Sequence, residues 1–260
     1  MQITFTVPAE TITKFVIAAE RAPVQLSSVI PWRMCRAHRR RAAETLGTAR
    51  LEVSRYRGSQ SPVPASAKHQ FTVTSAASLA DQPEAAQVAR AAAVALAQAC
   101  DGVIVDPLTG RSLIHRAGEP ESFRLTDHWL GWRVDIDDDT SCPPTGSVGN
   151  ATCACLTVTT RGLSRFGLPE IMLEGAACGH GRCAVHLLRS VAQQLLLGHL
   201  AWAAEHPRGG PRTIDDHVRV GTGPQARARL VPRDGDRLCL RLGPPGDFDG
   251  GVNAWLCQAA

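Results

Sequence analysis

Aromatic residues and lysine are scarce in this 260-residue chain: aromatic side chains make up 5% of it, and Lys14 and Lys68 are its only lysines. The core must therefore be filled mainly by Ala, Leu and Val. No apolar run approaches the roughly 20 residues that a membrane-spanning helix needs. With 44% hydrophobic and 20% charged residues, the composition excludes a disordered chain, a collagen-like repeat and a disulfide-rich miniprotein.

The first 15 residues also lack a basic segment followed by an apolar stretch, so they do not have the pattern of a signal peptide. The nine cysteines are an odd number, and they follow no framework spacing. We therefore expect a cytoplasmic protein whose thiols are mostly reduced and buried.

Positive charge is concentrated near the start of the chain. The net charge is only +4, yet Lys and Arg outnumber Asp and Glu by 12 to 6 within residues 1–100. Eight arginines lie between residues 33 and 57. Arg supplies 26 of the 28 basic residues, which is typical of a GC-rich genome, so a single Arg carries little functional information.

Apolar periodicity predicts a mixture of strands and helices. We expect an α+β fold with an antiparallel or mixed sheet and helices packed mainly on one face. The segment between the first strand and Ile30 is expected to be helical or irregular. Strands are predicted over 1–9, 51–57, 69–76, 129–136, 153–160 and 168–175, at the start of 102–113, and in 217–221, 226–231 and 236–243. Helices are predicted within 31–46, over 84–100 and over 181–205.

The helix over 84–100 carries its own boundary signals. Asp81 is the expected N-cap, and Pro83 and Glu84 fall in the first turn. Asp101-Gly102 marks the end. The packed side is nearly all alanine, so we expect this helix to approach its neighbours closely.

Residues 58–68, rich in Gly, Ser and Pro, predict a loop or linker. This boundary divides an N-terminal basic subdomain or extension (1–57) from a main α+β domain (69–260). A single domain over 1–260 is the alternative.

Cysteines and histidines gather around the start of the 181–205 helix. Zinc takes thiolate and imidazole ligands in a tetrahedron, and Cys153, Cys178, Cys183 and His186 provide such groups. Cys155 lies two residues from Cys153, so the two side chains should point the same way. No paired CxxC spacing is present, and cysteines are more often buried structural residues without a cofactor.

The same segment also permits a nucleophilic thiol. Cys183 lies near a helix N-terminus, where the helix dipole stabilises a thiolate. His180 or His186 would then serve as the base. No signature of a known cysteine hydrolase surrounds Cys183.

Acidic residues form two further groups. Asp135, Asp137, Asp138 and Asp139 follow a predicted strand, and Asp216 and His217 lie together with Asp215 ahead of another. Such oxygen ligands suit magnesium. Solvated loops and turn caps are the simpler interpretation, and Asp216 and His217 are kept as binding candidates.

The arginine-rich stretch offers a surface for polyanions. Trp32 can stack on a base while Arg36 and Arg40 neutralise phosphates. An acidic protein or an anionic lipid surface would suit the same residues. A solvated helix face in an Arg-rich proteome is the plainer interpretation.

The segment TRGLSRFGLPE (160–170) places two glycines and a proline between strands. We expect Arg161 and Glu170 to pair across this loop and Phe166 to anchor it in the core. Together with GVIVDPLTGR (102–111), it resembles a poorly characterised group of bacterial domains of unknown function. The resemblance spans about residues 69–205. It implies an α+β domain in a soluble bacterial protein and transfers no catalytic residues.

Sequence therefore favours a soluble binding or interaction module whose partner is a small molecule or a protein. Motifs for nucleotides, nicotinamide, flavin and a nucleophile elbow are absent. The alternatives are a Cys/His enzyme or zinc protein using residues 178–186, and nucleic-acid binding through residues 33–57. The sequence predicts neither a ligand nor an oligomeric state.

Overall fold

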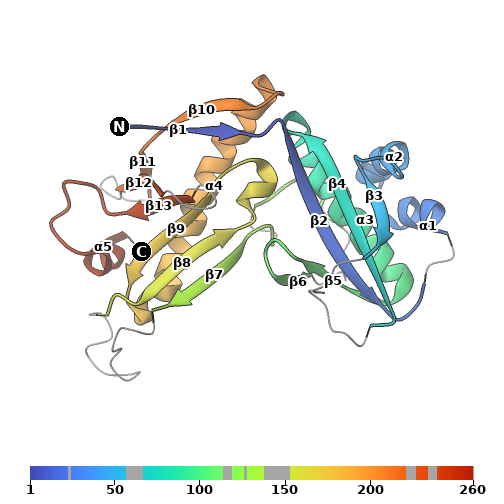
Figure 1. Ribbon diagram of the computed structural model, residues 1–260, viewed down its shortest axis with the longest axis horizontal. Helices are drawn as coiled ribbons and strands as arrows, with labels where there is room; N and C mark the ends of the chain where they lie inside the picture. Colours follow the sequence, from blue (N-terminus) through green and yellow to red (C-terminus); the bar gives the residue numbers. More distant parts are fainter. Residues whose placement is uncertain are drawn as a thin grey trace.

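A computed structural model describes residues 1–22, 25–56, 67–113, 119–125, 128–137, 153–220, 227–233 and 239–259. The described chain folds around two larger sheets that lie side by side in Figure 1. Each sheet has a long helix packed against it. The predicted α+β class, with antiparallel and mixed sheets, is confirmed.

The first sheet has five strands and is antiparallel throughout. Its central strand is β2, which pairs along its whole length with β4. In spatial order the strands are β3 (Glu52–Arg55), β4 (His69–Ser78), β2 (Glu10–Ala19), β5 (Gly102–Asp106) and β6 (Arg111–Leu113).

The second sheet has six strands and is mixed. All its neighbours are antiparallel except β13 and β9, which run parallel. In spatial order the strands are β11 (His217–Arg219), β12 (Arg227–Arg233), β13 (Cys239–Gly243), β9 (Glu170–Ala176), β8 (Leu156–Arg161) and β7 (Gly131–Ile136). The residues that join β12 to β13, 234–238, lie outside the described residues.

Helix α3 (Glu84–Cys100) packs on β2, β4 and β5, and α1 (Leu26–Arg33) and α2 (Arg36–Thr45) pack on α3. Helix α4 (Gly181–Glu205) packs on β8 and β9, and α5 (Val252–Ala259) contacts α4 and β9. Three short 3₁₀ turns complete the described elements: η1 (Leu79–Asp81), η3 (Leu163–Phe166) and η4 (Cys178–His180).

Alanine does bring α3 close to its neighbours, since nearly every alanine of this helix is buried. The predicted N-cap is wrong, however. Pro83 holds that position, and Asp81 instead accepts hydrogen bonds from Ser78 and Arg41, because η1 turns its carboxylate towards them. The predicted end is correct: Asp101 adopts the left-handed conformation at φ 53°.

The segment from the first strand to Ile30 is predicted to be helical or irregular. Residues 26–30 are helical, but residues 10–19 form β2 instead. The N-terminal strand β1 (Gln2–Val7) pairs with β10 (Gly210–Asp215), and β2 lies between β4 and β5. These pairings join residues 1–57 to β10 and to the five-stranded sheet; the division of the chain into domains stays a prediction. The predicted linker itself lies almost entirely outside the described residues.

Among the residues that the structure describes, no helix is both long enough and apolar enough to cross a membrane.

Candidate functional site

The loop 160–170 is organised by the carboxylate of Glu170. It accepts hydrogen bonds from the Thr160 hydroxyl at 2.7 Å and from the backbone N–H groups of Gly162 at 2.9 Å and Ser164 at 3.1 Å. The predicted Arg161–Glu170 pair is wrong. Arg161 donates to the Pro107 carbonyl at 3.2 Å, because the backbone donors already saturate Glu170.

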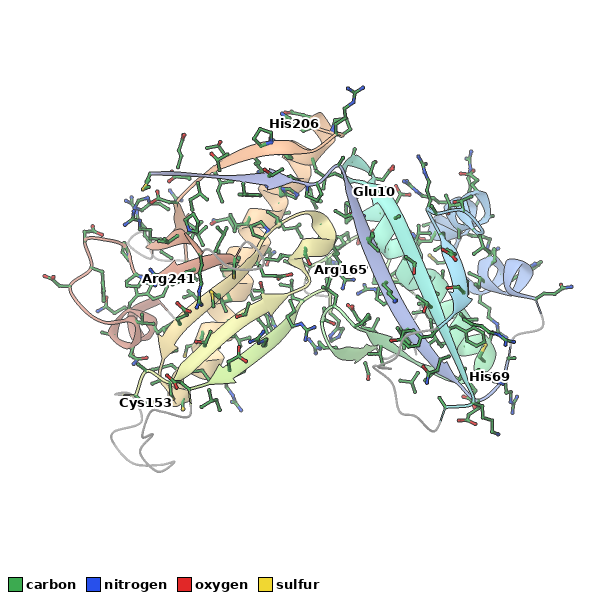
Figure 2. The ribbon with its side chains drawn as sticks, in the orientation of Figure 1. Glu10, His69, Cys153, Arg165, His206 and Arg241 are labelled. Atoms are coloured by element: carbon green, nitrogen blue, oxygen red, sulfur yellow. The ribbon has the colours of Figure 1, made fainter. Side chains whose placement is uncertain are left out.

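Phe166 anchors this loop in the core, as expected, and is fully buried. Its ring meets Trp129 edge-on at 6.0 Å between centroids. The neighbouring Arg165 forms a buried ion pair with Asp106 of the GVIVDP segment, at 2.5 Å. Figure 2 shows Arg165 between the two halves of the molecule. The loop therefore connects the two larger sheets. Phe166 is buried and Arg161 and Glu170 are half-buried, and their role in binding stays a prediction.

Three cysteines meet at one end of the six-stranded sheet. Cys153 and Cys155 lead into β8, and Cys178 begins η4. The Cys155 Sγ atom lies 3.6 Å from that of Cys153 and 3.0 Å from that of Cys178. All three sulfur atoms fall within 4.8 Å of one another. Cys153 and Cys155 are buried and Cys178 is exposed. We call these residues the thiol cluster, and Figure 2 labels Cys153.

Of the four predicted zinc ligands, Cys153 and Cys178 lie together in the thiol cluster, whereas Cys183 and His186 lie outside it. The 3₁₀ turn η4 ends before Gly181, so Cys183 and His186 stand on α4, outside the 4.8 Å group. Cys155 completes the cluster instead. The side-by-side placement of Cys153 and Cys155 is the sequence signal for this.

The predicted nucleophile has no base beside it. Within the described residues no hydrogen bond joins Cys183 to His180 or His186. The Nε2 atom of His180 instead lies 3.7 Å from the Sγ atom of Cys257 on α5. Activation of a thiol needs a base within hydrogen-bond reach, so the nucleophilic role of Cys183 stays a prediction.

A groove of about 650 Å³ runs beside the thiol cluster, between strands β7 and β8 and the first turns of α4. We call it the β7–α4 groove. Val134 and Val158 face each other directly across the β7–β8 pair. Val158 is fully buried, whereas Val134 is 52% exposed. The full lining is Val134, Leu156, Val158, Cys178, Gly179, Gly181, Arg182, Val185, His186 and Arg189.

The rim of the groove carries positive charge. Arg182, His186 and Arg189 are exposed on α4, and no carboxylate is among the described lining residues. The first turn of α4 has no side-chain cap, so its backbone N–H groups add partial positive charge. An apolar floor beside such a rim suits an anion with an apolar body. Sequence patterns missed Val134 and Arg189, because the groove depends on how α4 lies across the sheet.

Asp216 and His217 form a charge network rather than an open site. The buried Asp216 carboxylate contacts the Met1 ammonium at 2.7 Å, Arg229 at 2.9 Å and the His217 ring at 2.9 Å. The hydrogen bond from the N-terminal ammonium is the main cause that holds the pKa of Asp216 far below its usual value. The ligand atoms of Asp215, Asp216 and His217 also lie within 4.8 Å of one another, so the binding role of Asp216 and His217 stays a prediction. Of the other acidic group, Asp135 pairs with Arg133, and Asp138 and Asp139 lie outside the described residues.

The arginine-rich stretch is partly neutralised by its own helix. Arg40 pairs with Glu44 at 2.9 Å, and the guanidinium of Arg39 lies 5.9 Å from the Trp32 ring centre. Trp32 is 78% exposed, and Arg36 is exposed at the start of α2. These residues share a surface on α1 and α2, far in the fold from the β7–α4 groove (Figure 1).

Comparisons with family models, with curated proteins and with solved structures each found no match. The resemblance to bacterial domains of unknown function therefore stays a prediction, and function must be argued from the site.

Proposed function

We propose that this chain is a binding module for a small amphipathic anion, held in the β7–α4 groove. The observation that carries the proposal is the pairing of an apolar floor with a cationic rim. Val134, which is 52% exposed, and the half-buried Val185 would contact a hydrocarbon or aromatic body, and burying that surface yields about 25 cal/mol per Å². We place this module in the cytoplasm, as the cysteine usage of the sequence predicts, and in a bacterium, as the resemblance implies.

The rim would select the charged group of the ligand. Arg182 and Arg189 are separated by two turns of α4, so both reach along the same side of the groove. Arginine binds planar carboxylate and phosphate groups through paired hydrogen bonds. His186 lies between them and offers a ring N–H donor to an anion. A carboxylate or phosphate ester on an apolar body fits these features.

Binding of 8-anilinonaphthalene-1-sulfonate, an amphipathic anion that fluoresces in apolar sites, tests the proposal. Val134→Glu places a negative charge in the groove and should abolish the fluorescence gain. Val103→Glu is the matched control, because Val103 is 51% exposed on β5, outside the groove. Equal dye binding in the two variants would refute the proposal.

Charge selectivity is tested separately. Arg182→Gln should weaken dye binding by about fivefold, the effect of one partly screened charge contact. Arg208→Gln, at an exposed arginine outside the groove, should leave it unchanged. Decanoate should displace the dye and decanol should not, and displacement by both alike would contradict recognition of the anionic group.

A second candidate, nucleic-acid binding through α1 and α2, is favoured by the exposure of Trp32 next to arginines. Retention on heparin should then fall in Trp32→Ala together with Arg36→Gln. Elution of the wild type at the salt concentration of that variant would exclude this candidate.

A further inference from the structure

We infer that the thiol cluster is a zinc site, in which Cys153, Cys155 and Cys178 supply three thiolate ligands. Three sulfur atoms from two segments of the chain converge within 4.8 Å. Zinc binds thiolates at about 2.3 Å, so two sulfur ligands of a tetrahedral ion lie about 3.8 Å apart. The Cys153–Cys155 separation of 3.6 Å is close to this value. The fourth corner remains for water or a further side chain.

The alternative chemistry for such a cluster is a disulfide between Cys155 and Cys178. Their sulfur atoms lie 3.0 Å apart. This distance is longer than a disulfide bond, about 2.0 Å, and shorter than the separation of two sulfur ligands on a tetrahedral zinc ion, about 3.8 Å. A disulfide uses two sulfur atoms and gives no role to the third. Convergence of three is the pattern that a thiophilic ion requires, so the geometry favours zinc.

A backbone hydrogen bond also reaches the cluster. The backbone N–H of Cys178 points at the Cys153 Sγ atom at 3.3 Å. Such N–H donors stabilise metal-bound thiolates, and second-shell contacts of this kind hold ligands in place. The donor comes from one ligand segment and the acceptor from the other, so this contact already fixes their spacing.

Helix α5 clamps the same two segments together. The Asn253 side chain accepts a hydrogen bond from the backbone N–H of Ala177 at 2.7 Å and donates one to the Cys153 carbonyl at 2.9 Å. Ala177 directly precedes the ligand Cys178 in the chain, and the carbonyl belongs to the ligand Cys153 itself. The ligand backbones are thus positioned before an ion arrives, which lowers the entropy that binding must overcome.

Zinc content tests the inference on the full chain. Elemental analysis of protein purified under reductant should give about one zinc per chain. Cys178→Ser should lose the zinc, and because Cys178 is exposed this change opens no cavity. Cys183→Ser, which alters a cysteine outside the cluster, should keep it. Zinc retained in Cys178→Ser, or absent from the wild type after reconstitution, would overturn the inference, as would iron or copper in its place.

Thiol reactivity gives a readout that does not depend on a variant folding. Cys178 and Cys257 are both exposed, so both should be alkylated quickly if neither holds a metal. We expect Cys178 to react slowly until a chelator removes zinc, while Cys257 reacts quickly throughout. Equal rates before chelation, or a Cys155–Cys178 disulfide in protein that takes up no zinc once reduced, would overturn the zinc site.

Cys178 belongs to both the zinc site and the β7–α4 groove, but the two proposals can be refuted independently. Arg182→Gln should weaken dye binding without loss of zinc, because Arg182 is outside the cluster. If decanoate and decanol displaced the dye equally well from protein that still held its zinc, only the proposed function would be refuted.

Discussion

Arg165 and Asp106 form an ion pair in which both side chains are 1% exposed, with a donor–acceptor distance of 2.5 Å. Asp106 ends β5 of the five-stranded sheet, and Arg165 lies in η3, next to β8 and β9 of the six-stranded sheet. The two sequence segments singled out by their resemblance, GVIVDPLTGR and TRGLSRFGLPE, are thus joined by a buried charge contact. Burial is the main cause that lowers the pKa of Arg165, and Asp106 opposes that shift.

Removing one charge of this pair should destabilise the protein strongly. Asp106→Asn keeps an oxygen for the backbone N–H of Leu108 but leaves Arg165 as an uncompensated buried cation. We expect a loss of about 3–5 kcal/mol in the free energy of unfolding, measured by urea titration. Combining it with Arg165→Met should recover part of the loss. The exposed pair Arg40–Glu44 is the control, since Glu44→Gln should cost under about 0.5 kcal/mol.

Glu170 is a second stability determinant. Glu170→Gln keeps one oxygen, which can still accept from Gly162 and Ser164. Its NH₂ group cannot accept the hydrogen bonds that Thr160 and Leu163 donate to the other carboxylate oxygen. We expect a loss of about 2–3 kcal/mol, typical of buried donors left unpaired. Thermal unfolding of this variant against Glu174→Gln, at a glutamate of the same strand, gives the measurement. Equal melting temperatures would show that Glu170 does not organise the loop.

His199 should make stability depend on pH. Its ring is fully buried between the Phe166 carbonyl and Arg212. Burial, aided by Arg212, lowers the pKa of His199 from 6.5 to about 4. Since the unfolded chain binds a proton near pH 6.5 and the folded chain does not, stability is complete above that pH. It should fall by about 3 kcal/mol as the pH drops to 4.

Urea unfolding at a series of pH values measures this effect. The difference between pH 7 and pH 4 should shrink in His199→Gln and remain in His206→Gln, because His206 is exposed. An unchanged pH dependence in His199→Gln would assign the effect to other groups.

Gly162 should not tolerate a side chain. Its φ is +124°, and an added Cβ atom would lie 2.4 Å from the Trp129 carbonyl oxygen. Gly162→Ala should therefore cost more than about 3 kcal/mol, from backbone strain and the clash together. Gly175→Ala isolates the strain, because its φ is +77° and nothing lies within 4 Å of the added atom. That control should cost about 1–2 kcal/mol, as determined by thermal unfolding.

Most strands and both long helices could be predicted because their patterns are local. The failure at β2 has a physical reason. Its first half alternates buried and exposed residues, but Phe15 to Ala19 are buried without a break. Val16 and Ala18 pack with Val105 on the face opposite the main core. Once both faces of a strand are covered, alternation disappears and an apolar run fits a helix as well as a strand.

The candidate site, like the fold, could be predicted from the sequence only in part. Cys153 and Cys178 were predicted ligands, since residue type alone marks them. Cys183 and His186 were wrongly grouped with them, because helical spacing does not show that η4 separates them from the cluster. The groove and the Asn253 clamp bring together residues that are distant in sequence, and no local pattern carries that information.

The pairing of β1 with β10 delays the completion of folding while the chain is being synthesised. Thr4 and Thr213 touch across a separation of 209 residues, and a ribosome adds about 5–20 residues per second. Ile3, Phe5 and Val7, all buried in the finished fold, therefore lack their partner strand for on the order of ten seconds or longer. During that interval the nascent chain exposes an apolar strand with an unpaired edge. The folded protein depends on this strand being kept from other chains until nearly the whole sequence has emerged.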